Sequence, residues 1–284
     1  MDVLEILSID QTLIEMCLTK YAGQATEVIK EEGSAYDRII ISGGDGTLNE
    51  AITGLFSMEN PPILAYIPSG STNDFAKTLR LPRNIKSAAR LAKSNSIVKV
   101  DVALLNEKPF IYAAAFGAFT EVTYLTPQTS KNRLGHQAYL IEAVKSLTNL
   151  KAIPAKITYE EGVIEESFLY GMISNTTSVG GINNITGKRI ELDDGIFEGM
   201  FVIAPKNPFE LNDIFIALLM NKESEFIVRF KTKEVIVETQ DETEWVIDGE
   251  FAGSFSKTKI EVIQQKLPLA MPLAQKKSRQ KVLK

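Results

Sequence analysis

Four short segments of this 284-residue chain combine carboxylates with glycines, and two of them have the form of phosphate-binding loops. The first, Ser42–Glu50, follows an apolar run and holds three glycines around Asp45. Glycines let the backbone approach a ligand closely, and the free N–H groups at the start of a following helix attract an anion. Because Asp45 would repel a phosphate, its presence indicates a Mg²⁺ ion between the two. The alternative is a tight turn that Asp45 caps.

The second segment, Pro68–Phe75, is another polar loop, in which Thr72 or Asn73 is suited to cap the next helix. Loops that follow neighbouring parallel strands lie at the same edge of a sheet, where doubly wound folds bind ligands. We therefore expect Asp74 to join Asp45 near the metal ion. A capped helix start without a ligand also fits this loop when it is considered alone.

The other two segments are acidic turns in the second half of the chain. Glu191–Ile196 contains Asp194, and hard cations take carboxylate and carbonyl oxygens, so a cation site is one interpretation and a plain turn the other. Trp245–Phe251 contains Asp-Gly-Glu after an apolar strand. A carboxylate beside a phosphoryl group can orient a substrate hydroxyl and accept its proton. A simple hairpin turn fits these residues as well.

Composition excludes several other classes of protein. Cys17 is the single cysteine and His136 the single histidine, which excludes an intrachain disulfide and a Cys-rich zinc site and leaves His136 without an obvious catalytic partner. A formal net charge of -5 argues against nucleic-acid binding by bulk charge. The longest nearly apolar run, Pro109–Phe119, is too short to span a bilayer, and no secretory pattern opens the chain. We predict a cytoplasmic, non-redox protein that works with carboxylates, either an enzyme or a binding protein.

The elements that must position these segments begin as an alternation of strands and helices. Tyr36–Ser42, Pro62–Ile67 and Ile97–Leu105 are predicted to be buried strands, because their apolar runs are continuous and rich in β-branched residues. Helical spacing follows each glycine loop and recurs at Ile85–Ala92. This order predicts a parallel sheet covered by helices.

The pattern changes near residue 103, after which strands and hairpin signals dominate. Two helices, Ala138–Leu147 and Pro208–Met220, interrupt them. We therefore expect an α/β nucleotide-binding domain of residues 1–103, with about 268–284 packed back onto it, and a mainly antiparallel, β-rich domain of residues 104–267.

Together the four segments resemble the bacterial diacylglycerol kinase-like lipid kinases, relatives of the eukaryotic diacylglycerol and sphingosine kinases. The matching stretches are Gly43–Thr47, Ser69–Ala76, Leu192–Gly195 and Asp248–Glu250, in the order and spacing of that family. The first stretch is shared with NAD kinases and phosphofructokinases, whereas the second is much more specific. The resemblance implies an α/β nucleotide domain, a β-sandwich-like domain and an active site in the cleft between them.

The resemblance also implies roles for individual residues. Glu250 matches the catalytic base, with Asp248 beside it, and Asp45 and Asp74 complete an acidic network around a catalytic Mg²⁺. The residues that would hold ATP come from the two glycine loops and from a threonine ahead of the first helix of the family: Thr19, Gly43, Gly44, Asp45, Gly46, Thr47, Leu48, Asn49, Glu50, Gly70, Ser71, Thr72 and Asn73.

A second metal site and one departure complete this resemblance. Asp194, with the carbonyls of Glu191 and Ile196, matches the structural Mg²⁺ site of the family. The family also opens with an Asn-Pro-containing glycine loop that grips ATP phosphate, but residues 1–18 contain neither proline nor glycine.

The leading hypothesis is an ATP- and Mg²⁺-dependent lipid kinase that converts diacylglycerol to phosphatidic acid. The substrate would be met at a membrane surface by reversible, peripheral association, and a homodimer is consistent with the resemblance. Two alternatives remain. A NAD kinase-like enzyme is compatible with Gly43–Thr47, and the departure at residues 1–18 motivates a non-catalytic nucleotide- or lipid-binding regulator on the same scaffold.

Overall fold

The computed structural model of the chain describes residues 3–8, 13–71, 73–118, 151–176, 178–179, 182–183, 191–220 and 222–272. The predicted helix Ala138–Leu147, together with His136 and Thr72, lies outside these residues. The elements of the first part are α1 (Val3–Leu7), α2 (Gln24–Glu32), the 3₁₀ turn η1 (Gly33–Ala35), β1 (Arg38–Gly43), α3 (Asp45–Phe56), β2 (Ile63–Pro68), α4 (Asp74–Thr78), α5 (Ile85–Lys93), β3 (Ile97–Leu105), β4 (Lys108–Phe110) and β5 (Ala113–Gly117). Those of the second part are β6 (Ile153–Tyr159), β7 (Gly162–Ser174), β8 (Ser178–Val179), β9 (Ile182–Asn183), β10 (Phe197–Ile203), α9 (Pro208–Met220), β11 (Ile227–Thr232), β12 (Glu234–Ile247) and β13 (Glu250–Ala270).

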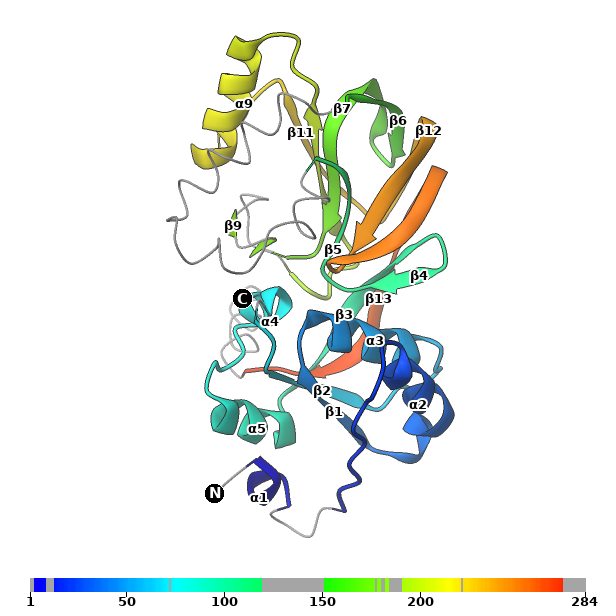
Figure 1. Cartoon of the computed structure of the whole chain (residues 1–284), viewed down its shortest axis with the longest axis vertical. Helices are drawn as coiled ribbons and strands as arrows, with labels where there is room; N and C mark the ends of the chain where they lie inside the picture. Colours follow the sequence, from blue (N-terminus) through cyan, green and yellow to red (C-terminus); the bar gives the residue numbers. More distant parts are fainter. Residues whose placement is uncertain are drawn as a thin grey trace, which may run out of the picture.

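Within these residues an 11-stranded sheet runs through the whole molecule. Its main path is β1-β2-β13-β12-β5-β7-β10-β11; β3 pairs with β13, β4 pairs with β3, and β6 pairs with both β12 and β7. Figure 1 shows β1 and β2 among helices in the lower half and the long strands β7 and β12 in the upper half. The strands β3 and β13 pass from one half to the other.

The parallel sheet predicted for residues 1–103 is much smaller than expected. β1 and β2 pair in parallel along their whole length, and β13 adds a single parallel pair, Leu269↔Leu64. β3 pairs antiparallel with β13, which lies between β2 and β3. A strand from far along the chain therefore occupies the place beside β2 that the predicted order gave to β3. The pairings of β5, β6, β7, β10, β11 and β12 are antiparallel, as predicted for the second half.

Helices cover both faces of the sheet in the lower half. Leu64 and Tyr66 of β2 belong to the core that also contains residues of α2 and α3. Ala65 and Ile67, the alternate residues, pack with α1 and with the alanines of α5. This alternation follows from the two-residue period of a strand, and continuous apolar character is what a strand covered on both faces requires.

A second core lies in the upper half and is rich in aromatic residues. The rings of Phe116 and Trp245 are 4.9 Å apart between centroids, and those of Phe168 and Phe201 are 5.6 Å apart. The change of pattern near residue 103 coincides with the point at which β3 leaves the first core, since Val102 belongs to the first and Ala103 to the second. The division into two domains itself stays a prediction.

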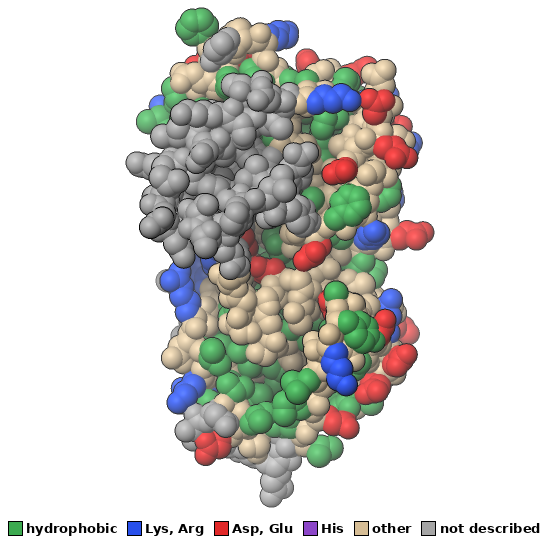
Figure 2. Space-filling view, in the orientation of Figure 1, with side chains coloured by type: hydrophobic (Ala, Val, Ile, Leu, Met, Phe, Trp, Pro, Cys, Tyr) green, Lys and Arg blue, Asp and Glu red, His purple; other side chains and the backbone are tan. Residues whose placement is uncertain are grey.

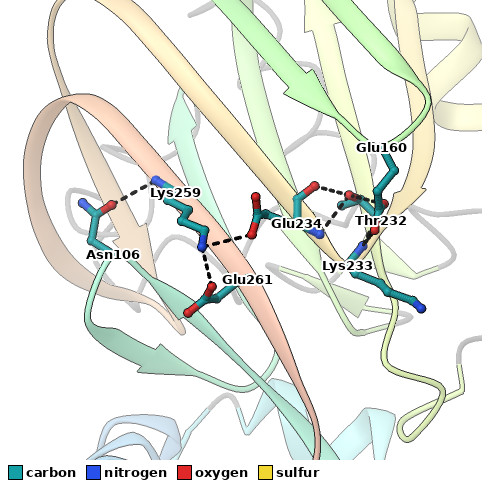
Figure 3. A network of polar contacts seen from close by, with 7 residues as sticks. All are labelled: Asn106, Glu160, Thr232, Lys233, Glu234, Lys259 and Glu261. Carbon is teal, nitrogen blue, oxygen red and sulfur yellow. Dashed lines mark hydrogen bonds and ion pairs between the residues drawn. The ribbon is translucent and has the colours of Figure 1, made fainter.

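A network of polar contacts joins strands of the upper half, away from the glycine loops (Figure 3). The Lys259 ammonium group lies 3.0 Å from Glu234 and 2.6 Å from Glu261, and its backbone N–H donates to Asn106 at 2.9 Å. Glu160, in the turn of the β6–β7 hairpin, accepts hydrogen bonds from Thr232 at the end of β11 and from the N–H group of Lys233. Exposed ion pairs contribute at most about 1 kcal/mol each, so this network helps to align strands rather than to dominate stability.

In the described ranges, no helix combines the length and the apolar character needed to cross a membrane.

Candidate active site

The first glycine loop joins a parallel strand to the start of a helix. β1 ends at Gly43, and α3 begins at Asp45 with the extended residue Gly44 as its N-cap. Leu48, Ala51, Ile52 and Leu55 then give α3 a buried face at helical spacing. Its N-cap residue, Gly44, has no side chain with which to cap the first turn. Its backbone N–H groups are therefore available for an anion, as the sequence predicted for a phosphate cradle.

The second loop contacts the first one backbone to backbone. The Gly43 carbonyl accepts hydrogen bonds from the N–H groups of Ser69 at 2.9 Å and Gly70 at 3.1 Å. A Cβ atom added at Gly70 would lie only 2.5 Å from the Cα atom of Gly44. Glycine at position 70 is thus required by the close approach of the two loops.

Asn73, predicted to contact ATP, uses its side chain to shape the second loop. Its backbone is left-handed, with φ of 50°, a conformation that Asn tolerates better than most residues. Its amide oxygen accepts hydrogen bonds from the N–H group of Gly70 at 3.1 Å and the hydroxyl of Tyr66 at 3.0 Å. Its amide nitrogen donates to the Gly70 carbonyl at 2.6 Å. The described contacts of this side chain are therefore internal to the protein.

Asp45 and Asp74 meet where the two loops touch. The backbone N–H of Asp74 donates to Oδ2 of Asp45 at 3.1 Å. Oδ1 of Asp45 is buried and, among the described residues, has no hydrogen-bond partner. Burial raises the pKa of Asp45, and the negative charge of Asp74 acts in the same direction. The Asp74 carboxylate lies 2.7 Å from the ammonium group of Lys77. A buried carboxylate oxygen without a donor fits a ligand of a cation.

The acidic segment near the end of the chain is a two-residue hairpin turn between β12 and β13. Asp248 and Gly249 have φ of 48° and 89°, and Ile247 pairs with Glu250 across the turn. Positive φ at both residues is the type I′ pattern that Asp-Gly favours. The hairpin reading of this segment is confirmed, and it leaves Glu250 as an exposed first residue of β13.

Asp248 is bound by protein groups on both of its carboxylate oxygens. Oδ1 accepts from the N–H groups of Tyr112 and Ala113, each at 3.0 Å, while Oδ2 accepts from Ile111 N–H at 2.9 Å and from the Asn49 amide at 3.0 Å. The residue is 3% exposed. Burial raises the pKa of Asp248 to about 6, although the four donors act in the opposite direction. Its contacts make it an anchor of the turn.

The same contacts bring Glu250 to the first glycine loop. A Cβ atom added at Gly46 would lie 3.1 Å from Oε1 of Glu250, so this carboxylate is at the first turn of α3. The hydrogen bond from Asn49 to Asp248 joins the turn to the same helix. Figure 2 shows acidic side chains at the level where the two halves meet.

Tyr112, which the sequence did not single out, lies among these carboxylates. Burial raises its pKa well above the usual range, and the negative charges of four acids add to the effect: Asp248, Asp45, Asp74 and Glu250. The structure therefore places all four predicted catalytic residues around one tyrosine.

Other predicted ATP-site residues serve the fold or lie at its surface. The Glu50 carboxylate accepts hydrogen bonds from the N–H groups of Gly23 at 2.8 Å and Ala25 at 3.1 Å, and so caps the start of α2. The Leu48 side chain is 1% exposed and belongs to the first core. Thr19 is exposed in the segment before α2, and Ser71 is exposed in the second loop.

The second metal segment forms a cluster of its own. Asp194 accepts a hydrogen bond from Ile196 N–H at 3.1 Å, and burial raises its pKa. Asp101 in β3, which the sequence did not single out, accepts from Gly195 N–H and Gln265 N–H, both at 2.7 Å. No group of three acidic, histidine or cysteine side chains suited to a metal is found in the described ranges, so a cation here would need carbonyl oxygens.

Comparison with known proteins relates this geometry to a family. A model of the diacylglycerol kinase catalytic domain matches residues 1–105. The diacylglycerol kinases of Staphylococcus epidermidis and Bacillus subtilis are both 32% identical to this chain, over 83% of its length and over 75% and 78% of their own. A crystal structure of a diacylglycerol kinase from Bacillus anthracis str. Sterne is 28% identical, with a TM-score of 0.74 over 96% of this chain and 89% of that one.

These findings establish the class of the protein, a phosphotransferase that acts on an alcohol acceptor. The chain belongs to the diacylglycerol kinase family, and the resemblance seen in its four acidic segments is thereby confirmed.

Proposed function

We propose that this protein is an ATP- and Mg²⁺-dependent lipid kinase that transfers the γ-phosphoryl group of ATP to the free hydroxyl of diacylglycerol, giving phosphatidic acid. The observation that carries the proposal is the position of the Glu250 carboxylate at the uncapped first turn of α3. A carboxylate that can accept a proton therefore lies next to a helix start that can bind the phosphates of ATP. The names of the relatives support the choice of lipid.

In this proposal the residues divide the work of phosphoryl transfer. The N–H groups of Gly46 and its neighbours at the start of α3 bind the ATP phosphates. Glu250 accepts the proton of the lipid hydroxyl. The oxygen of that hydroxyl forms a bond to the γ-phosphorus of ATP while the bond between the γ-phosphorus and ADP breaks. Asp248 positions Glu250 through its four hydrogen bonds. Positioning and charge neutralisation then supply most of the rate.

The donor set near the two loops fits a catalytic Mg²⁺. Asp45 has a buried oxygen without a described donor, and Asp74 lies beside it. Mg²⁺ supplies charge neutralisation of the phosphate oxygens when it is bound. We further propose a structural Mg²⁺ at Asp194 with the carbonyls of Glu191 and Ile196, because all three groups offer the oxygen ligands that this ion prefers.

The proposal also assigns a ligand to each half of the molecule. Residues 1–103, with the end of β13 packed beside β2, would form the nucleotide-binding part, and residues 104–267 the lipid-binding part. The protein would act from the cytoplasm and meet its substrate by transient association with a membrane surface. A homodimer is compatible with this arrangement, and sedimentation of the purified protein would test it.

The test is a radiolabelled γ-phosphoryl transfer assay with Mg²⁺ against a panel of extracted lipids. Glu250→Gln should lower the rate at least about a hundredfold, because it removes the general base. Glu244→Gln is the matched control, since Glu244 is also an exposed glutamate of the same hairpin. Transfer by folded Glu250→Gln at the wild-type rate would show that the assigned role is wrong.

The same labelled ATP offered with NAD as the acceptor, together with a measurement of nucleotide binding, separates the alternatives. Labelled NADP formed from NAD would favour the NAD kinase-like enzyme. Nucleotide binding without transfer to any lipid would favour the non-catalytic regulator that the composition of residues 1–18 motivates.

A further inference from the structure

Tyr112 is held rigidly between the glycine loops and the hairpin turn. It follows β4, its side chain is 6% exposed, and its ring stacks on Phe75 with centroids 5.9 Å apart and an interplanar angle of 18°. Its backbone N–H donates to Asp248, and its carbonyl accepts from Asn175 N–H at 2.9 Å. Both the ring and the backbone are therefore fixed by neighbours.

The hydroxyl end of this ring lies over the turn that presents Glu250. A Cβ atom added at Gly249 would lie 3.5 Å from the Tyr112 hydroxyl oxygen. Among the described residues the hydroxyl has no hydrogen-bond partner, and it is not one of the fully buried polar atoms, so a bound ligand can reach it. A tyrosine hydroxyl is neutral at pH 7, since its ordinary pKa is about 10. The site therefore holds a fixed neutral donor with its proton uncommitted.

We propose that the Tyr112 hydroxyl donates a hydrogen bond to a non-bridging oxygen of the phosphoryl group during its transfer. This inference rests on the proposed function and names a further catalytic residue for it. The four neighbouring carboxylates cannot donate to an anionic phosphoryl group while they are ionised, whereas a neutral phenol can. A fixed donor aimed at developing charge stabilises a transition state without reorganisation.

The acceptor alcohol is a poorer partner for this donor on chemical grounds. A hydrogen bond to the attacking oxygen would draw on the electron pair that forms the new bond. The tyrosine proton stays on its oxygen throughout, and the proton of the alcohol goes to Glu250. No covalent step at Tyr112 is required.

Tyr112→Phe tests the inference, because phenylalanine keeps the ring, the stack on Phe75 and the backbone bond to Asp248. Tyr159→Phe is the matched control, since Tyr159 also stacks on a phenylalanine, Phe230, but in the second core. The rate of lipid phosphorylation and the melting temperature are measured for wild type and both variants. We expect kcat of Tyr112→Phe to fall by about tenfold to a hundredfold, with KM for ATP and for lipid changed less than about twofold.

Each other outcome overturns the inference. Unchanged kcat in Tyr112→Phe, with wild type active, would show that the hydroxyl takes no part in transfer. A raised KM for lipid at constant kcat would place the hydroxyl on the alcohol instead. A loss of kcat accompanied by a much lower melting temperature than that of Tyr159→Phe would mark a structural role. Absence of transfer by wild type itself would defeat the proposed function and this inference together.

Discussion

The first glycine loop and the Asp248 hairpin turn both place an aspartate next to a glycine, half-buried at Asp45 and buried at Asp248, yet they use it in opposite ways. Asp248 accepts four hydrogen bonds from the protein, two on each oxygen. Asp45 accepts its described bond on Oδ2, while Oδ1 is buried without a described partner. A carboxylate saturated by its own protein is suited to hold the fold, whereas one with an open oxygen is suited to hold a ligand. The motif alone does not distinguish the two.

The largest expected effect comes from removing Asp248, the carboxylate whose oxygens are both fully hydrogen-bonded. Asp248→Ala leaves four donors without their carboxylate, and three of them are backbone groups in a buried position. We expect the free energy of unfolding to fall by about 3 kcal/mol or more. Glu250→Gln, in the same turn but exposed, should change it by less than about 0.5 kcal/mol. Urea unfolding of both variants measures the contrast, and equal losses would mean that Asp248 is not the anchor.

A second effect concerns the contact of the two loops. Gly70→Ala places a Cβ atom 2.5 Å from the Cα atom of Gly44, and backbone atoms cannot move aside cheaply. The expected loss is about 1–3 kcal/mol, with weaker nucleotide binding. The control is Gly44→Ala, the same change on the other side of this contact, which places its Cβ atom at an ordinary 3.5 Å from the Cα atom of Gly70. Similar melting temperatures for the two variants would contradict the close approach.

A third effect is the dependence of the Asp248 anchor on pH. Because burial raises the folded pKa of Asp248 to about 6, above its ordinary value of 3.8, the folded protein holds this proton more tightly. The stabilisation is present at low pH and is lost as pH rises through 6. The cost of Asp248→Ala should therefore be greater at pH 5 than at pH 7, by about 1 kcal/mol. The opposite slope in urea unfolding would show that the four donors outweigh burial.

The smallest effect on stability is expected at Asp45, the carboxylate with an oxygen that has no described partner. Asp45→Asn removes the negative charge of a carboxyl group whose pKa is raised by burial and by Asp74. Because Oδ1 has no described hydrogen-bond partner, the substitution breaks no described hydrogen bond at that oxygen. Without Mg²⁺ the variant should be as stable as wild type or more stable by up to about 1 kcal/mol. Phosphoryl transfer should nevertheless be lost. A clear fall in melting temperature without Mg²⁺ would show that Asp45 also serves the fold.

Local features were readable from the sequence because short-range physics decides them. The helical spacing after Gly44, the continuous apolar strands and the Asp248-Gly249 turn depend on neighbours within a few residues. The helix Pro208–Met220 was predicted with the bounds that the structure gives to α9. The meeting of Asp45 and Asp74 was expected from two loops that follow neighbouring parallel strands. Their gathering with Asp248 and Glu250 was expected from the family resemblance alone.

Long-range features escaped the sequence for the same reason. Nothing near β2 indicates that Leu269 will pair with it, so the parallel sheet was overestimated. Tyr112 lies in a uniformly apolar run, and its hydroxyl becomes unusual only through burial in the fold and through carboxylates that are distant in the sequence. Asp101 could have been noticed in the sequence, because it is an acid within the apolar strand Ile97–Leu105. A carboxylate at such a position must have hydrogen-bond or ionic partners to be buried.

The position of β13 has a consequence for synthesis. This strand starts at Glu250 and ends between β2 and β3, so the middle of the sheet is built from the described strand that leaves the ribosome last. Until then β2 and β3 each expose an unpaired edge, which is a template for aggregation. A nascent chain therefore acquires Glu250, the proposed base, and closes the sheet beside β2 in one late event. A message cut short before β13 would yield a product with open sheet edges rather than a protein of reduced activity.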